Sequence, residues 1–187
     1  MTRPPSILSR IESERLIIRA PEVSDATELN RATVASLAQL RPWMPWAQTV
    51  PTLAISRRHC REAAGKYRSG TDLMLLLFAK DTGELIGSSG LHRIDWSVPR
   101  FEIGYWVSTR HAGRGYATEA ARAIGDFAFK TLKAARVEIV CDHRNARSRH
   151  VAERAGFPLE AILKFHRRDV RGRLGDTCIF AQTRHRK

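Results

Sequence analysis

The chain has 187 residues, 43% of them hydrophobic and 27% charged, which is the balance of an ordinary globular protein and excludes a disordered one. Its 32 Lys and Arg against 19 Asp and Glu give a formal net charge of +13, which predicts attraction to polyanions such as a phosphorylated cofactor or an RNA surface. No run of about 18 apolar residues occurs, which excludes a membrane span, and the N-terminus lacks the apolar core of a signal peptide. We therefore expect one cytoplasmic domain over residues 1–187, with its core at about 11–183 and a disordered basic tail from Arg184 to Lys187.

The cysteines point to a reducing compartment and to no metal. Cys60, Cys141 and Cys178 are isolated and odd in number, which is typical of reduced thiols that pack as small hydrophobic side chains. The nearest approach to a ligand cluster is Cys141 with His143 and His150, and no CxxC or HExxH spacing accompanies it. We predict that the chain has no metal site.

The first predicted elements are a strand, a helix and an aromatic loop. The segment Glu14–Arg19, with three apolar residues in a row at Leu16–Ile18, indicates the strand. Ser24 or Asp25 is expected to cap a helix that reaches about Leu40. The segment Arg41–Trp46 contains two prolines and two tryptophans and is expected to form a loop.

A second helix and a hairpin follow. The helix is expected from about Leu53 to Tyr67, ending near Gly70. Leu73–Ala79 is a continuous apolar run, which indicates a buried strand. The turn residues Asp81–Gly83 separate it from a strand at Leu85–Ile94, so that the two strands are expected to form a hairpin.

A strand, a glycine turn and a helix come next and carry the strongest signal in the chain. Phe101–Ser108 is rich in aromatic and β-branched residues and is predicted to be a strand. Gly113 and Gly115 permit a tight turn and the close approach of a ligand to the backbone. Small and apolar residues then recur at helical spacing up to about Lys130, namely Ala117, Ala120, Ala121, Ile124 and Ala128.

This helix begins without a capping side chain. No Ser, Thr, Asp or Asn stands at the expected N-cap, so its first backbone amides lack a side-chain partner. Free amides at the positive end of a helix dipole form a site for phosphate. Because Arg110 and Arg114 add cationic donors beside the turn, we interpret Arg110–Ala117 as a pyrophosphate cradle.

The last elements complete a mixed α/β domain with the order β-α-α-β-β-β-α-β-α-β-β. Val137–Cys141 is predicted to be a short strand, and Asn145 is expected to cap a helix that stops at Gly156. Leu159–Gln182 is expected to hold two strands that meet around Asp169–Gly175.

Two well-known phosphate-binding folds fit the sequence poorly. A dinucleotide-binding unit also places glycines between a strand and a helix, but Thr118 stands where its third glycine belongs. The chain after the motif is also too short for a six-stranded doubly wound sheet. A P-loop is excluded, because no Gly-Lys-Ser or Gly-Lys-Thr occurs.

The element order and five motifs together resemble the GNAT N-acetyltransferase superfamily, whose members bind acetyl-CoA, and in particular its Rim-type branch, which acetylates N-terminal amines of ribosomal proteins. The motifs are Glu102–Tyr105, Arg110-x-x-Gly113-x-Gly115, Gly115–Ala120, Asn145-x-x-Ser148 and Glu153–Phe157. The likeness extends from Glu14-Arg15-Leu16 to the closing strands and so covers nearly the whole chain.

The resemblance implies a fold and a cofactor site. The central sheet should be mostly antiparallel and should splay between its fourth and fifth strands, with pantetheine in the gap. Trp106, Val107 and Ser108 would then lie along pantetheine, and the Val107 amide would stabilise the oxyanion. The residues implied to hold the rest of acetyl-CoA are Arg110, Gly113, Arg114, Gly115, Tyr116, Ala117 and Asn145. Asn145 also remains open as a plain helix cap.

The resemblance and the residue chemistry suggest two catalytic side chains. Glu102 is the candidate general base, acting through a water, and its alternative role is an ion pair with Arg93 or Arg100. Ser148 is the candidate proton donor to the departing thiolate, and its alternative role is a capping hydroxyl. Trp43 and Trp46 would border the acceptor site, although core packing fits them as well.

The acceptor stays open among three alternatives. The resemblance favours direct attack, in a ternary complex, by the N-terminal amine of a ribosomal protein, with the basic surface docking on the ribosome or on RNA. A small amine such as a polyamine, an aminoglycoside or an amino-acid derivative is the alternative, and a non-catalytic CoA- or RNA-binding module is the third. Edge strands near the C-terminus are expected to allow a homodimer.

Overall fold

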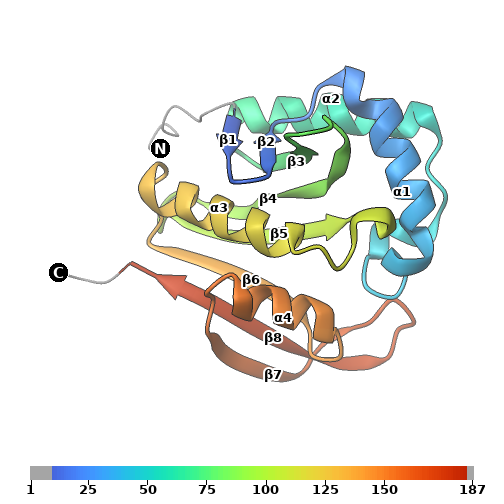
Figure 1. Ribbon diagram of the computed structural model, residues 1–187. Helices are drawn as coiled ribbons and strands as arrows, with labels where there is room; N and C mark the ends of the chain where they lie inside the picture. Colours follow the sequence, from blue (N-terminus) through green and yellow to red (C-terminus); the bar gives the residue numbers. More distant parts are fainter. Residues whose placement is uncertain (1–9, 185–187) are drawn as a thin grey trace.

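In a computed structural model, which describes residues 10–184, eight strands form one sheet in the order β1-β2-β3-β4-β5-β6-β8-β7 (Figure 1). The strands are β1 (Arg10–Glu12), β2 (Leu16–Arg19), β3 (Leu73–Ala79), β4 (Leu85–Asp95), β5 (Arg100–Val107), β6 (Arg136–Asp142), β7 (Leu159–Arg168) and β8 (Leu174–Thr183). Neighbouring strands are antiparallel except β5 and β6, which are parallel. This mostly antiparallel mixed sheet confirms the predicted fold and excludes a doubly wound one.

Four helices cover the two faces of the sheet. They are α1 (Ala26–Leu40), α2 (Leu53–Ser69), α3 (Tyr116–Lys130) and α4 (Ala146–Arg154). The larger core packs α3 against one face, where Ile124 meets Phe101 and Ile103. A smaller core joins α1 and α2 to the other face through residues such as Leu29 and Leu76. Within residues 10–184, no helix combines the length and the apolar character that a membrane crossing needs.

The sheet opens between β5 and β6, as predicted for the fourth and fifth strands of the sequence. The two strands pair only over Arg100–Glu102 and Arg136–Glu138. Beyond Glu102, β5 continues beside β4, whereas β6 continues beside β8 as far as Asp142. The backbone groups that β5 turns away from β4 therefore face a gap between the strands.

The first predicted strand is in fact two. Glu14 and Arg15 lie in a tight turn between β1 and β2, closed by the Ser13 amide on the Leu16 carbonyl at 3.0 Å. The prediction of a single strand at Glu14–Arg19 was wrong because β1 has only three residues, two of them charged, and shows no apolar alternation.

Helix α1 begins after Asp25, one of its two predicted caps. A 3₁₀ turn at Val23–Asp25 precedes the helix, and Asp25 occupies the N-cap, but its side chain accepts no amide of the helix. The Asp25 carboxylate instead accepts the Glu22 amide at 2.7 Å and pairs with Arg19 at 2.7 Å. A second 3₁₀ turn, Pro45–Gln48, begins inside the segment that was predicted as a loop.

The other helix ends follow their predicted signals. Gly70, in the left-handed region with φ of 69°, ends α2. Asn145 caps α4 by accepting the Ser148 amide. The predicted basic tail lies outside the described residues apart from Arg184, as does the chain before Arg10.

One cap gives a direct test of local stability. The Thr52 hydroxyl accepts the Ile55 amide at 3.2 Å and caps α2. Thr52→Ala should lower the free energy of unfolding by about 1 kcal/mol, because it leaves that amide without its partner. Urea denaturation measures the change. Coenzyme affinity should not change, since α2 lies on the opposite face of the sheet from α3.

Candidate active site

The N-terminus of α3 is open, as the missing cap signal predicted. Gly113 and Gly115 have φ of 78° and 83°, which only glycine adopts without strain. Gly115 occupies the N-cap and provides no side-chain hydrogen bond to the first turn. The amides of Tyr116 and Ala117 therefore stand at the positive end of the helix dipole without a side-chain partner.

Arg15 is a cation at this turn that the sequence did not reveal. Its guanidinium donates to the Arg114 carbonyl at 3.1 Å and pairs with Glu119 at 2.7 Å. It also lies 4.6 Å from the centre of the Tyr116 ring. These contacts join the β1–β2 turn to the start of α3 across about a hundred residues of chain, so no local pattern could have predicted them.

The two arginines predicted for the cradle differ in their surroundings. Arg110 is exposed and pairs with Glu84 at 3.0 Å, so part of its charge is already compensated. Arg114 is exposed between the two glycines. We therefore regard Arg114 as a stronger candidate for a phosphate contact than Arg110 or Arg15, because the Arg15 charge is already paired with Glu119.

The end of β5 presents backbone groups to the gap. The Ser108 amide donates to Ile86 of β4 at 2.9 Å. Since successive residues of a strand alternate in direction, the Val107 amide faces the opposite side, toward the gap. The Val107 carbonyl accepts the Gln39 side chain of α1 at 3.3 Å. The candidate oxyanion donor thus lies at the open side of the sheet.

The tryptophans gather on the face that α1 and α2 cover. Trp46 and Trp106 have ring centres 6.2 Å apart, and Trp106 also packs against the small cluster around Leu37 and Leu40. Trp43 is 37% exposed and Trp46 is 51% exposed. Core packing therefore does not explain either side chain of the loop.

Glu102 lies where β5 and β6 part. Its side chain is 20% exposed, and the Arg93 guanidinium lies 3.5 Å from Oε2, as the ion-pair alternative expected. Burial raises the pKa of Glu102 above its ordinary value of 4.5, while the charges of Arg93 and His92 oppose the rise. A carboxylate with a raised pKa suits proton transfer at neutral pH better than an ordinary one.

Ser148 meets a tyrosine of β5. The Tyr105 hydroxyl lies 3.0 Å from Ser148 Oγ and donates to the Ser148 carbonyl at 2.9 Å. Burial raises the pKa of Tyr105, which keeps the phenol protonated. The facing strand therefore supplies a phenol beside Ser148, a contact that sequence spacing does not reveal.

The cysteines are buried, as predicted. Cys141 is 5% exposed, and Cys60 and Cys178 are fully buried. Burial raises the pKa of Cys141 to about 11, so the thiolate that a nucleophile needs is disfavoured. This chemistry does not favour a covalent route through Cys141.

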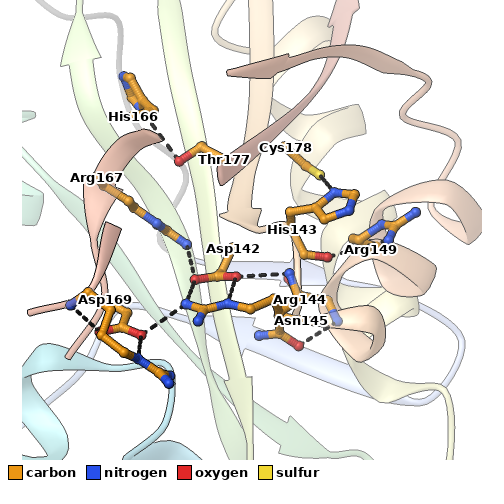
Figure 2. A network of polar contacts seen from close by, with 12 residues as sticks. Asp142, His143, Arg144, Asn145, Arg149, His166, Arg167, Asp169, Thr177 and Cys178 are labelled. Carbon is orange, nitrogen blue, oxygen red and sulfur yellow. Dashed lines mark hydrogen bonds and ion pairs between the residues drawn. The ribbon is translucent and has the colours of Figure 1, made fainter. Parts of the chain in front are cut away.

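An ionic network holds the start of α4 in place (Figure 2). Arg144 contacts Asp142 at 2.8 Å and Asp169 at 3.1 Å, which ties the end of β6 to the β7–β8 turn. Arg167 approaches Asp142 at 3.9 Å from the other side. Because Asn145 and Ser148 follow directly in the chain, this network fixes where both side chains lie.

Three comparisons with known proteins agree with this geometry. The sequence model of the acetyltransferase (GNAT) domain family matches residues 15–158. YdaF of Bacillus subtilis, named as a candidate ribosomal N-acetyltransferase, is 32% identical over 78% of this chain and 79% of its own. The ribosomal-protein-serine acetyltransferase of Escherichia coli is 29% identical over 81% and 84%. The solved structure of RimL, a ribosomal alpha-N-protein acetyltransferase in complex with coenzyme A, superposes with a TM-score of 0.85 at 24% identity and covers 93% of this chain and 97% of that one.

Proposed function

This chain belongs to the GNAT acetyltransferase family, and on that premise we propose that it transfers the acetyl group of acetyl-CoA to the free N-terminal amine of a ribosomal protein. The observation that carries the proposal is the uncapped start of α3, beside a sheet that opens at Glu102. One region offers phosphate-binding amides and the other a half-buried carboxylate. The two are joined by a single strand, β5.

The residues present suit a coenzyme with several phosphates. Gly113 and Gly115 leave the helix amides uncovered, and a Cβ at Gly115 would meet only the mobile end of Arg15, at 3.4 Å. Arg15 and Arg114 bring positive charge to the same turn. We assign the pyrophosphate to this turn and the pantetheine chain to the gap along Trp106, Val107 and Ser108. Asn145 lies on the far side of that gap.

Acetyl-CoA supplies an activated acetyl thioester. The protein must then transfer protons and stabilise the negative charge that develops on the carbonyl oxygen. Glu102 accepts a proton from the amine nitrogen through a water, which removes the positive charge that the nitrogen gains as the C–N bond forms. The Val107 amide donates to the carbonyl oxygen as negative charge develops there. Ser148 donates its hydroxyl proton to the departing sulfur and regains one from water, while the Tyr105 hydroxyl at 3.0 Å orients it.

The Tyr105 contact gives a measurable prediction. Tyr105→Phe removes the hydroxyl that orients Ser148, and kcat should fall about fivefold, the usual value of one neutral hydrogen bond. The Kd for acetyl-CoA should not change. Steady-state kinetics and calorimetry measure the two. In a Ser148→Ala background the same substitution should have no further effect, and additive losses would contradict the coupling.

A protein N-terminus suits the acceptor side better than a polyamine does. A polyamine calls for a pocket with several free carboxylates, and the acidic residues nearest to this face already have cationic or imidazole partners. Asp25 pairs with Arg19, Asp72 with His92 and Glu102 with Arg93. The curated relatives that act on ribosomal proteins favour the same acceptor.

The basic surface supports docking on an RNA-rich target. Arg57, Arg61 and Arg68 of α2 are exposed, and their spacing places them along one side of the helix. The net charge of +13 adds a long-range attraction to phosphate backbones. We include the ribosome surface as a partner in the proposal.

Thermal unfolding tests the coenzyme half of the proposal, and peptide acetylation tests the acceptor half. Acetyl-CoA or coenzyme A at about a hundred times Kd should raise Tm by roughly 3 °C or more, and NAD should not. A peptide with a free N-terminal serine should then gain an acetyl group, measured by mass, while its N-acetylated twin should not. An unchanged Tm with both coenzymes would reject the cradle, and an unmodified peptide would reject this acceptor.

A further inference from the structure

The imidazole of His92 lies close to two glycines of neighbouring strands. Gly90 of β4 and Gly104 of β5 are register partners. A Cβ at Gly104 would lie 3.1 Å from Cδ2 and 3.4 Å from Nε2 of His92, and one at Gly90 would lie 3.1 Å from Cε1. A Cβ at Gly104 would meet only the ring, so this glycine leaves room for it, whereas a Cβ at Gly90 would first meet the Leu73 carbonyl oxygen of β3 at 2.5 Å.

Asp72 fixes which nitrogen of this ring is free. Its Oδ2 lies 2.8 Å from Nδ1 of His92, and a carboxylate oxygen can only accept. Nδ1 therefore carries the proton, and in the neutral ring Nε2 keeps its lone pair. The ring is 33% exposed, so that Nε2 can exchange protons with solvent. A histidine held in one tautomer by a carboxylate is the arrangement of a proton acceptor.

His92 shares its face of the sheet with the acceptor side of the site. It is the register partner of Glu102, and Gly104 and Trp106 follow on that same face of β5. Glu102 is the carboxylate proposed above to accept a proton from the amine. The free nitrogen thus lies one strand from that carboxylate, on the side from which Trp46 contacts Trp106.

We propose that His92, oriented by Asp72, is a second proton acceptor for the amine, a role that rests on the function proposed above. An N-terminal amine is largely protonated at neutral pH and loses two protons on becoming an amide. The first N–H bond breaks as Nε2–H forms, which leaves a free amine and an imidazolium paired with Asp72. The imidazolium then releases this proton to solvent, and the second proton goes through water to Glu102.

A merely structural role makes different predictions. The His92–Asp72 contact ties β4 to the segment before β3. If it served only as a structural clamp between these segments, it would contribute to stability and would not need a free Nε2. His59 of α2 is the matched control. The negative charge of Asp72 also favours the protonated form of His59, but His59 contributes no group to the site. Loss of a clamp would lower Tm with little effect on turnover.

The experiment combines kinetics with a measurement that needs no substrate. With the serine peptide as probe, His92→Ala should lower kcat about tenfold, less than a sole base would, because Glu102 and water remain. Added imidazole should restore part of the loss, Asp72→Asn should lower kcat without such rescue, and His59→Gln should match the wild type. In the free enzyme at alkaline pH, ¹⁵N NMR should show Nδ1 of His92 protonated and Nε2 bare.

The outcomes separate the two proposals. If the wild type leaves the peptide unmodified, only the acceptor assignment is rejected. The tautomer of His92 measured by ¹⁵N NMR then still tests whether Nε2 is free to accept a proton. Protonated Nε2 overturns the inference whatever the kinetics show. Full turnover in His92→Ala, or a loss that imidazole does not repair, overturns it as well.

Discussion

Glu102→Gln should lower kcat about a hundredfold and leave the Kd for acetyl-CoA unchanged, because general-base catalysis contributes at least that factor. The amide keeps the size of the side chain but cannot take a proton. In the wild type kcat should fall as the pH drops through the pKa of Glu102, which burial raises above 4.5. The variant should lose this acidic limb. Steady-state kinetics over a range of pH measure the fall in kcat and the loss of the acidic limb.

Glu138→Gln is the matched control for that substitution. Glu138 is the register partner of Glu102 on β6, and its charge helps to raise the pKa of Glu102. Its removal should shift the acidic limb to lower pH and leave the plateau of kcat unchanged. Because the raised pKa means that ionised Glu102 destabilises the fold at neutral pH, Glu102→Gln should not lower Tm there. An unchanged kcat across the pH range would remove Glu102 from the mechanism.

The sequence predicted those parts of the fold whose signals are local. Leu73–Ala79 is fully buried, and seven apolar residues in a row predicted such a strand. The left-handed Gly70 and the Asn145 cap fixed two helix ends. The short β1 and the 3₁₀ turn at Val23–Asp25 escaped prediction, because neither has enough residues to show a period.

The candidate site also has parts that local sequence signals predicted and parts that only tertiary packing brings together. The glycine turn and the helix that follows it are contiguous, so spacing alone indicated an open helix N-terminus. Arg15 reaches that turn, and Tyr105 reaches Ser148, only through tertiary packing. Asp72 belongs to none of the sequence motifs and meets His92 only through tertiary packing, and only the sheet register brings His92 over Gly104. Contacts between distant residues carry no periodic signal.

β5 links these parts because its side chains alternate between the two faces. Phe101 and Ile103 pack under α3, and Tyr105 reaches Ser148 of α4 from the same side. Glu102 and Trp106 lie on the opposite side with His92. In the proposed function, this strand separates the coenzyme side from the acceptor side, and its backbone amides face the gap between β5 and β6.

Gly115→Val should weaken acetyl-CoA binding about a hundredfold or more. Gly115 has φ of 83°, and a β-branched residue there is strained. The backbone would relax and turn the amides of Tyr116 and Ala117 away from the phosphates. Hydrogen bonds between an amide and a charged group contribute about 1.5–3 kcal/mol each, so the loss of two accounts for that factor. Isothermal titration calorimetry with acetyl-CoA measures the change.

Gly172→Val separates the loss of the cradle from the cost of strain. Gly172 has φ of 77° in the β7–β8 turn, and a Cβ there would meet nothing within 4 Å. Both variants should lose about 1–3 kcal/mol of stability, because each forces a β-branched residue into the left-handed region. Only Gly115→Val should lose affinity for the coenzyme. Equal affinities in the two variants would show that the phosphates bind elsewhere, and the positive charge of Arg15 and Arg114 would then have another role.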